Sequence, residues 1–134
     1  MSRFYTYKTI NAEAVVMTNC VLNQISEGAK IDIEDVDIIE KIVKTHFQDK
    51  PWIYLANRVF SYSVDPLVYE KASQLTNLVG FGIIACGDEA RKSAEYEQHF
   101  TKKPFEIFKN ITQALVWADK LCSTTNSNLH RKIR

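Results

Sequence analysis

Polar and aromatic side chains gather in one short segment of this chain, immediately after an apolar run. The segment holds hydrogen-bonding, cationic and hydroxyl-bearing groups, namely Asn57, Arg58, Ser61, Tyr62, Ser63 and Asp65. In sheets with parallel strands, ligands and modified residues collect beyond the carboxyl ends of the strands, where the backbone NH groups of the next helix are free. We therefore expect the functional edge of the protein at residues 57–65.

Hydroxyl groups in this segment suggest one specific chemistry, the acceptance of a phosphate. Ser63 is the first candidate for a phosphoacceptor and Ser61 the second. A phosphate near a helix N-terminus gains from the exposed NH groups, whereas the carboxylate of Asp65 would repel it. The alternative is structural, because Ser63 and Asp65 are also residue types that shape a turn and cap a helix.

Arg91 could bring a second cation to this edge. It lies at the start of a later helix, which would face the same edge if the central strands are adjacent and parallel. Arg58 and Arg91 would then be placed to bind a carboxylate or another anion in bidentate fashion. Pairing with Asp65 or Glu95 is the alternative for these arginines.

Aromatic and thiol groups leave two further possibilities open. Phe60, Tyr62, Tyr69 and Phe81 either belong to the core or line a pocket for a small apolar or amphiphilic ligand. The three cysteines, Cys20, Cys86 and Cys122, are widely spaced in apolar surroundings, which argues against a disulfide framework or a zinc site. We interpret them as core residues, with a reactive thiol at Cys86 as the alternative.

Motifs of common enzymes and cofactor sites are absent from the sequence. It contains no dinucleotide-binding glycine pattern, no phosphate loop, no serine-hydrolase elbow and no zinc-protease motif. Its three histidines are not spaced as metal ligands on one helix. We predict a non-enzymatic protein without metal or cofactor, and an enzyme of unrecognised type is the alternative.

Length and charge limit the class of protein. The 134 residues correspond to about one domain, and 17 basic residues nearly balance 16 acidic ones, so no global field would hold nucleic acid. No run approaches the roughly 18 apolar residues that cross a bilayer, and the N-terminus lacks the apolar region of a secretory signal. We expect a cytoplasmic protein that neither binds nucleic acid nor spans a membrane.

Strands at the N-terminus are the first elements that would position the site. Residues 3–10 alternate aromatic and polar side chains and residues 13–18 form a β-rich apolar run, which together predict an antiparallel hairpin. Residues 20–25 could extend that edge as a third short strand. The predicted helices begin at Ile33 after Asp32 in a capping box with Asp35, at Pro66 after Asp65, near Glu89 and after Asn110.

Two apolar runs, residues 52–56 and 78–86, predict buried central strands. Helices follow both, so these strands should pair in parallel, and residues 104–108 should form an edge strand. The result is an α/β fold with a mixed sheet of four or five strands and about four helices. We expect a single domain over residues 1–122 and a polar, frayed tail over residues 123–134.

This order of elements resembles the SpoIIAA-like group of the STAS superfamily, named for sulfate transporters and anti-sigma factor antagonists. The resemblance covers about residues 3–122 and rests on the opening hairpin and helix, the strand WIYLAN, the serine-bearing loop, the helix DPLVYEKA and the strand LVGFGIIAC. In phosphorylated antagonists the corresponding loop resembles Asp-Ser-x-Gly-Leu, and its serine accepts phosphate from an anti-sigma kinase. Here SYSVDPLVY has no Asp-Ser pair and no glycine after the serine.

Stand-alone SpoIIAA-like proteins also lack that signature, and the resemblance implies a small regulatory or ligand-binding module that sometimes self-associates. Our leading hypothesis is an interaction module whose loop at residues 57–65 contacts a partner protein or a second copy of the chain. One alternative is a carrier of a small apolar or amphiphilic ligand, which a pocket under the loop would favour. The other is an enzyme of unrecognised type.

Overall fold

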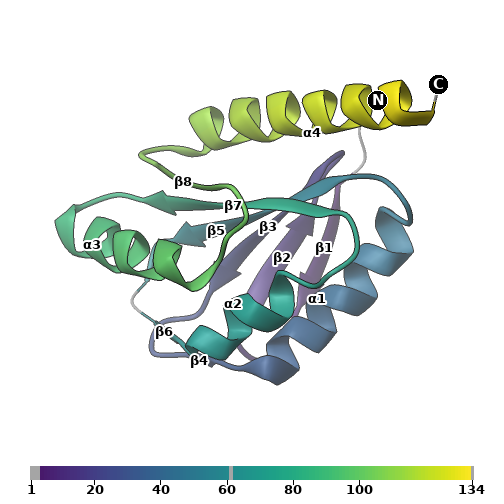
Figure 1. Cartoon of the computed structure of the whole chain (residues 1–134). Coiled ribbons are helices and arrows are strands. Elements are labelled where there is room, and N and C mark those ends of the chain that lie inside the picture. The colour runs from purple at the N-terminus through teal and green to yellow at the C-terminus, as the bar shows by residue number, and fades with distance from the viewer. Residues whose placement is uncertain (1–3, 61, 134) are drawn as a thin grey trace.

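Figure 1 shows the computed structural model of the chain, a twisted sheet with helices on both of its faces. The structure describes residues 4–60 and 62–133, with side chains up to residue 125. Within these residues the main sheet has six strands in the order β1, β2, β3, β5, β7, β8. Two short strands, β4 (Lys30–Ile31) and β6 (Ser63–Val64), form a separate parallel pair that the sequence did not indicate.

The N-terminal strands confirm the predicted hairpin and extend it. Strands β1 (Tyr5–Lys8) and β2 (Ala12–Val16) pair antiparallel. Strand β3 (Cys20–Ile25) pairs antiparallel with β2 and parallel with β5 (Trp52–Arg58). Because β3 is paired on both sides, it joins the hairpin to the parallel strands, and the described sheet has six strands instead of four or five.

The central strands are parallel neighbours, as predicted. Strand β7 (Leu78–Ala85) pairs with β5, and β8 (Phe105–Phe108) follows at the edge of the sheet. Strand β5 is longer than expected, because Arg58 still pairs with Ala85. Asn57 and Arg58 therefore belong to the strand and not to the loop in which the sequence analysis placed them.

Helix starts follow the capping signals of the sequence. Helix α1 (Ile33–His46) begins after Asp32, whose carboxylate accepts from the helix while Asp35 completes the capping box. Helix α2 (Pro66–Ala72) begins after Asp65, whose carboxylate accepts from a backbone NH of the first turn. Both predictions are confirmed, because an N-cap acts within a few residues of sequence.

The last helix is longer than the sequence indicates. Helix α4 (Ile111–Ile133) includes the backbone of residues 123–133, where we expected a frayed tail. That stretch contains neither proline nor glycine, so nothing in it interrupts helical hydrogen bonding. The hydroxyls of Thr124 and Thr125 also donate to carbonyl oxygens one turn earlier in the helix.

The helices divide between the two faces of the sheet. Helices α1 and α2 cover one face together with α3 (Asp88–Glu97), which continues into a 3₁₀ turn, η1 (Gln98–Phe100). Helix α4 covers the other face, where its small buried residues Ala114 and Ala118 allow close packing on β5. Figure 1 shows α4 alone on its side of the sheet.

Candidate functional site

The segment after β5 is tied to the start of α1 by the short pair β4 and β6. The backbone NH of Ser63 donates to the carbonyl oxygen of Ala29 at 3.1 Å. The backbone NH of Asp65 donates to the carbonyl oxygen of Ile31 in β4 at 3.2 Å. The side chain of Ser63 is exposed, whereas Ser61 lies outside the described residues. Asp65 is occupied as the cap of α2. Phosphorylation of Ser63 stays a prediction.

Arg58 is buried at the end of β5 and paired inside the protein. Its Nη2 atom donates to Oε2 of Glu97 at 2.6 Å, and the Tyr69 hydroxyl donates to Oε1 of the same carboxylate at 2.6 Å. The ring of Tyr62 packs over the guanidinium, with 4.5 Å between the ring centroid and Cζ. Among the residues described, Nε and Nη1 of Arg58 have no hydrogen-bond partner. The guanidinium of Arg58 is therefore not accessible to solvent at the end of β5.

Burial and charge change the proton affinities in this cluster. Burial raises the pKa of Tyr69 well above its ordinary value, and the charge of Glu97 adds to that effect. Burial also raises the pKa of Tyr62, although the charge of Arg58 opposes the shift. For Arg58, burial lowers the pKa, but the interactions with Tyr62 and Glu97 outweigh it and the pKa is raised. The phenols thus stay neutral and the guanidinium stays charged at neutral pH.

Asn57 and Arg91 make contacts outside this cluster. The side-chain amide of Asn57 donates to Oε1 of Gln24 at 3.5 Å. The Nε atom of Arg91 pairs with Oε1 of Glu95 on its own helix at 3.2 Å. Pairing with Glu95 is the alternative to anion binding that the sequence left open for Arg91.

The cysteines differ in exposure. Cys20 and Cys122 are buried, as expected, but Cys86 is exposed, because it follows the last residue of β7. Burial raises the pKa of Cys20 to about 12 and that of Cys122 to about 11, so both remain thiols at neutral pH. The interpretation of all three as core residues is wrong for Cys86.

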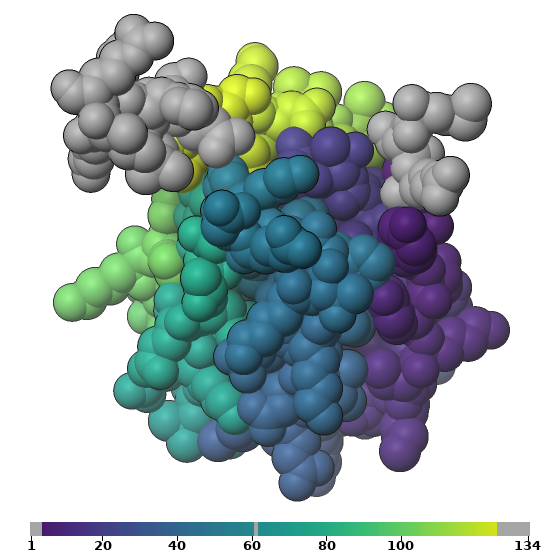
Figure 2. Space-filling view, turned by 90° about the vertical axis from the view of Figure 1, so that its right-hand side faces the viewer, coloured from purple at the N-terminus to yellow at the C-terminus, as the bar shows by residue number. Residues whose placement is uncertain are grey.

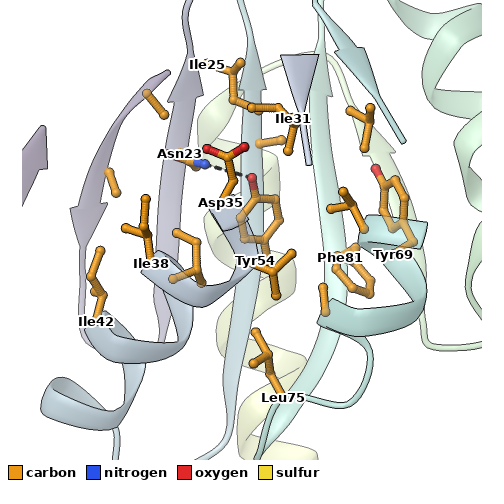
Figure 3. Close-up of a pocket in the computed structure, with 18 of the residues that line it drawn as sticks. Asn23, Ile25, Ile31, Asp35, Ile38, Ile42, Tyr54, Tyr69, Leu75 and Phe81 are labelled. Atoms are coloured by element: carbon orange, nitrogen blue, oxygen red, sulfur yellow. Dashed lines mark hydrogen bonds between the residues drawn. The ribbon is translucent and has the colours of Figure 1, made fainter. Parts of the chain in front are cut away.

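An apolar cavity of about 70 Å³ lies between the sheet and helices α1 and α2 (Figure 3). Three of the four aromatic residues that the sequence suggested for a pocket line it, namely Tyr62, Tyr69 and Phe81. Phe60 does not, because its side chain is exposed to solvent. The remaining walls are mostly aliphatic, and α1 contributes Val36, Ile38, Ile39 and Ile42.

A row of short side chains in the sheet explains this space. Asn23 of β3 lies level with Ala14 of β2 on one side and with Ala56 of β5 on the other. All three line the cavity. Because alanine methyl groups are short, they leave a gap between the sheet and α1 that larger residues would fill.

One end of the cavity is polar. The amide nitrogen of Asn23 donates to the Tyr54 hydroxyl at 2.9 Å, but its buried Oδ1 atom has no hydrogen-bond partner in the described part of the chain. Asp35 of α1 also lines the cavity, where its carboxylate accepts from the Asn11 side chain and from the backbone NH of Asp32. Burial raises the pKa of Tyr54, so this phenol stays neutral.

Sequence reasoning missed two central residues of these sites. Asn23 alternates with Val21 and Ile25, and this period of two places its amide on the buried face of the strand. Glu97 lies three residues after Ala94, on the one buried stripe of α3. In the sequence, Asn23 and Glu97 were therefore recognisable as polar residues at positions where the pattern predicts apolar ones.

Metal-binding clusters and membrane-spanning helices are both absent from the described part of the chain. The described residues contain no cluster of three or more His, Cys, Asp or Glu side chains suited to hold a metal ion. No helix in the described part of the chain is both long enough and apolar enough to cross a membrane.

Comparison with known proteins places the fold. No family model matches the chain, and no curated protein matches its sequence. A solved structure from Shewanella loihica PV-4, an uncharacterized protein of the DUF3478 family, superposes with a TM-score of 0.50 at 13% identity, over 87% of this chain and 93% of that chain. That structure is described as having a SpoIIAA-like fold. The chain therefore has the mixed α/β, SpoIIAA-like fold that the order of its elements predicts.

Proposed function

We propose that this chain is a binding module whose cavity takes a small apolar ligand. The observation that carries the proposal is the cavity between the sheet and α1, whose walls are aliphatic and aromatic and whose polar groups gather at one end. Ligand sites typically combine such apolar walls with a few polar groups that set the orientation of the ligand. Among the functions compatible with the sequence, the ligand carrier is the one that a pocket favours.

The volume limits what this ligand can be. An apolar cavity of about 150 Å³ binds benzene, so a space of about 70 Å³ accommodates only a short apolar chain. Ile38 lines the cavity and is also 38% exposed, which places an opening beside α1. Figure 2 looks onto α1, with the hairpin on one side and α2 on the other. Butan-1-ol is about as large as benzene, so the part of it that the cavity does not enclose would project from this face.

Native mass spectrometry of the protein from its own host tests the proposal. We expect a bound small molecule that is lost when Ala14→Leu fills the cavity, because the added side chain occupies the space beside Asn23. The matched control is Val116→Leu on the opposite face, where the side chain is 49% exposed. An unliganded mass, together with no amide NMR shifts on titration with butan-1-ol, would contradict the proposal.

A second candidate function is self-association through the edge where the strands end. The exposed apolar side chains there are Ile10, Ile33, Val59, Phe60 and Leu67. They belong to the hairpin turn, the first turns of α1 and α2, and the segment after β5. An apolar edge can pair with its own copy across a two-fold axis, because such contacts need no opposite charge. These residues support the interaction hypothesis better than Arg58, whose side chain is buried.

A further inference from the structure

Two hydrogen-bonding atoms at the polar end of the cavity differ in what they offer a ligand. Oδ1 of Asn23 is an acceptor, and within the residues described it is buried without a partner. The Tyr54 hydroxyl accepts from Nδ2 of Asn23 at 2.9 Å, so its own proton can be donated to a further acceptor. A single ligand group that both donates and accepts would satisfy both atoms.

An unpaired buried acceptor is costly, and this cost makes Asn23 selective. Its side chain lies in a row between Ala14 and Ala56, so a ligand above that row meets the amide directly. A ligand that donates to Oδ1 removes the penalty and gains affinity beyond its apolar contacts. A ligand of equal shape that cannot donate leaves the penalty in place.

Charge on the cavity wall disfavours an anionic head group. The Asp35 carboxylate accepts from the side chain of Asn11 and the backbone NH of Asp32, and it brings a negative charge to the cavity. No Lys, Arg or His is among the described residues that line the cavity. A carboxylate would therefore meet an acceptor and a like charge. An ammonium group could donate to Asn23, but it has no lone pair for the Tyr54 proton.

We propose that the cavity selects an uncharged alcohol with a short apolar chain. The ligand hydroxyl donates to Oδ1 of Asn23 and accepts from the hydroxyl of Tyr54, while its chain lies along Ala14 and Ala56 toward α1. The inference rests on the proposed ligand-binding function, because it names the chemical class of the molecule in that cavity.

Titration of the full chain with matched small molecules tests this inference by amide NMR. Butan-1-ol and diethyl ether are isomers, but only the alcohol donates a hydrogen bond. We expect the alcohol to bind roughly tenfold more tightly than the ether, since the ether leaves Oδ1 unpaired. Butyrate and butylammonium, which add a negative and a positive charge, should both bind more weakly than the alcohol.

Variants show which atoms carry the preference. Asn23→Leu preserves the approximate size of the side chain without its polar atoms, so alcohol and ether should bind this variant with similar affinity. Tyr54→Phe removes the donor to the ligand, together with the acceptor of the Asn23 amide NH, and should reduce the preference for the alcohol. If Asn23→Leu does not fold, the four probes on the unaltered chain and on Tyr54→Phe still decide the question.

Distinct results overturn the two proposals. Equal dissociation constants for butan-1-ol and diethyl ether, or tighter binding of butyrate, would overturn the alcohol selectivity and leave apolar ligand binding intact. No binding of any probe would overturn both. A crystal soaked in butan-1-ol that shows only an ordered water at Asn23 would also overturn the selectivity.

Discussion

At the residue scale, the buried pair of Arg58 and Glu97 gives the sharpest prediction. The side chains are only 5% and 10% exposed, so removing one charge strands the other away from water. Glu97→Gln should lower the free energy of unfolding by about 3–5 kcal/mol. Replacing both partners, as Arg58→Met with Glu97→Leu, should recover most of that loss, because no charge is then buried alone. Urea denaturation measures each value.

A matched control uses the exposed pair on the same helix. Arg91 and Glu95 are 47% and 50% exposed, so Glu95→Gln should change the free energy of unfolding by less than about 1 kcal/mol. If Glu97→Gln lowers the free energy of unfolding by no more than Glu95→Gln does, the Arg58–Glu97 ion pair does not stabilise the packing of α3 on β5. Tyr69→Phe probes the remaining hydrogen bond to the Glu97 carboxylate.

At the element scale, Gly80 sets how closely β7 approaches its neighbours. A Cβ atom there would lie 2.9 Å from the carbonyl oxygen of Pro104 and 3.3 Å from Cδ2 of Leu121. That carbonyl oxygen also accepts from the NH of Phe81 at 2.9 Å, so it cannot move away without weakening the sheet. Gly80→Ala should therefore destabilise the protein by about 1–3 kcal/mol in urea denaturation.

The control for this prediction lies in the opposite edge strand. Thr6 of β1 is exposed, and Thr6→Ala should alter the free energy of unfolding by about 0.5 kcal/mol or less. Thermal unfolding of both variants gives an independent measure. Unchanged stability of Gly80→Ala would mean that β8 shifts freely to accommodate the methyl group.

At the scale of the whole molecule, the apolar edge predicts concentration-dependent self-association. The side chains of Val59 and Phe60 are 57% and 41% exposed, next to the buried Arg58. Replacing both with serine should weaken a dimer by roughly tenfold or more, because apolar residues at an interface centre carry much of its energy. Sedimentation velocity over a range of concentrations measures the change.

The control for this prediction is Tyr96→Ser in α3. Tyr96 is 67% exposed and lies in the last turn of α3, outside the apolar set of Ile10, Ile33, Val59, Phe60 and Leu67, so the substitution should leave association unchanged. A chain that is monomeric at every concentration would contradict self-association. Ligand binding in the cavity would be untouched by that result, since neither Val59 nor Phe60 lines it.

Local signals allowed much of the fold to be predicted. The capping box of Asp32 and Asp35 and the Asp65 cap were recognisable because each acts within one helical turn. The strand of residues 78–85 was recognisable because it is a short, continuous apolar run that ends at turn residues, which is typical of a buried strand. The order of most elements, and the edge on which we expected function, followed from such short-range patterns, and that order resembles the SpoIIAA-like fold.

The candidate site depended on contacts between distant residues, which such patterns do not specify. Arg58 was expected in an open loop, but Glu97, 39 residues away, holds it in the core. The cavity exists because the register of three strands sets Ala14, Asn23 and Ala56 side by side. Strand register is a property of the assembled sheet, since each strand alone is compatible with several pairings. The sequence by itself determined most of the elements, and only the tertiary structure decided the β4–β6 pair and which side chains meet.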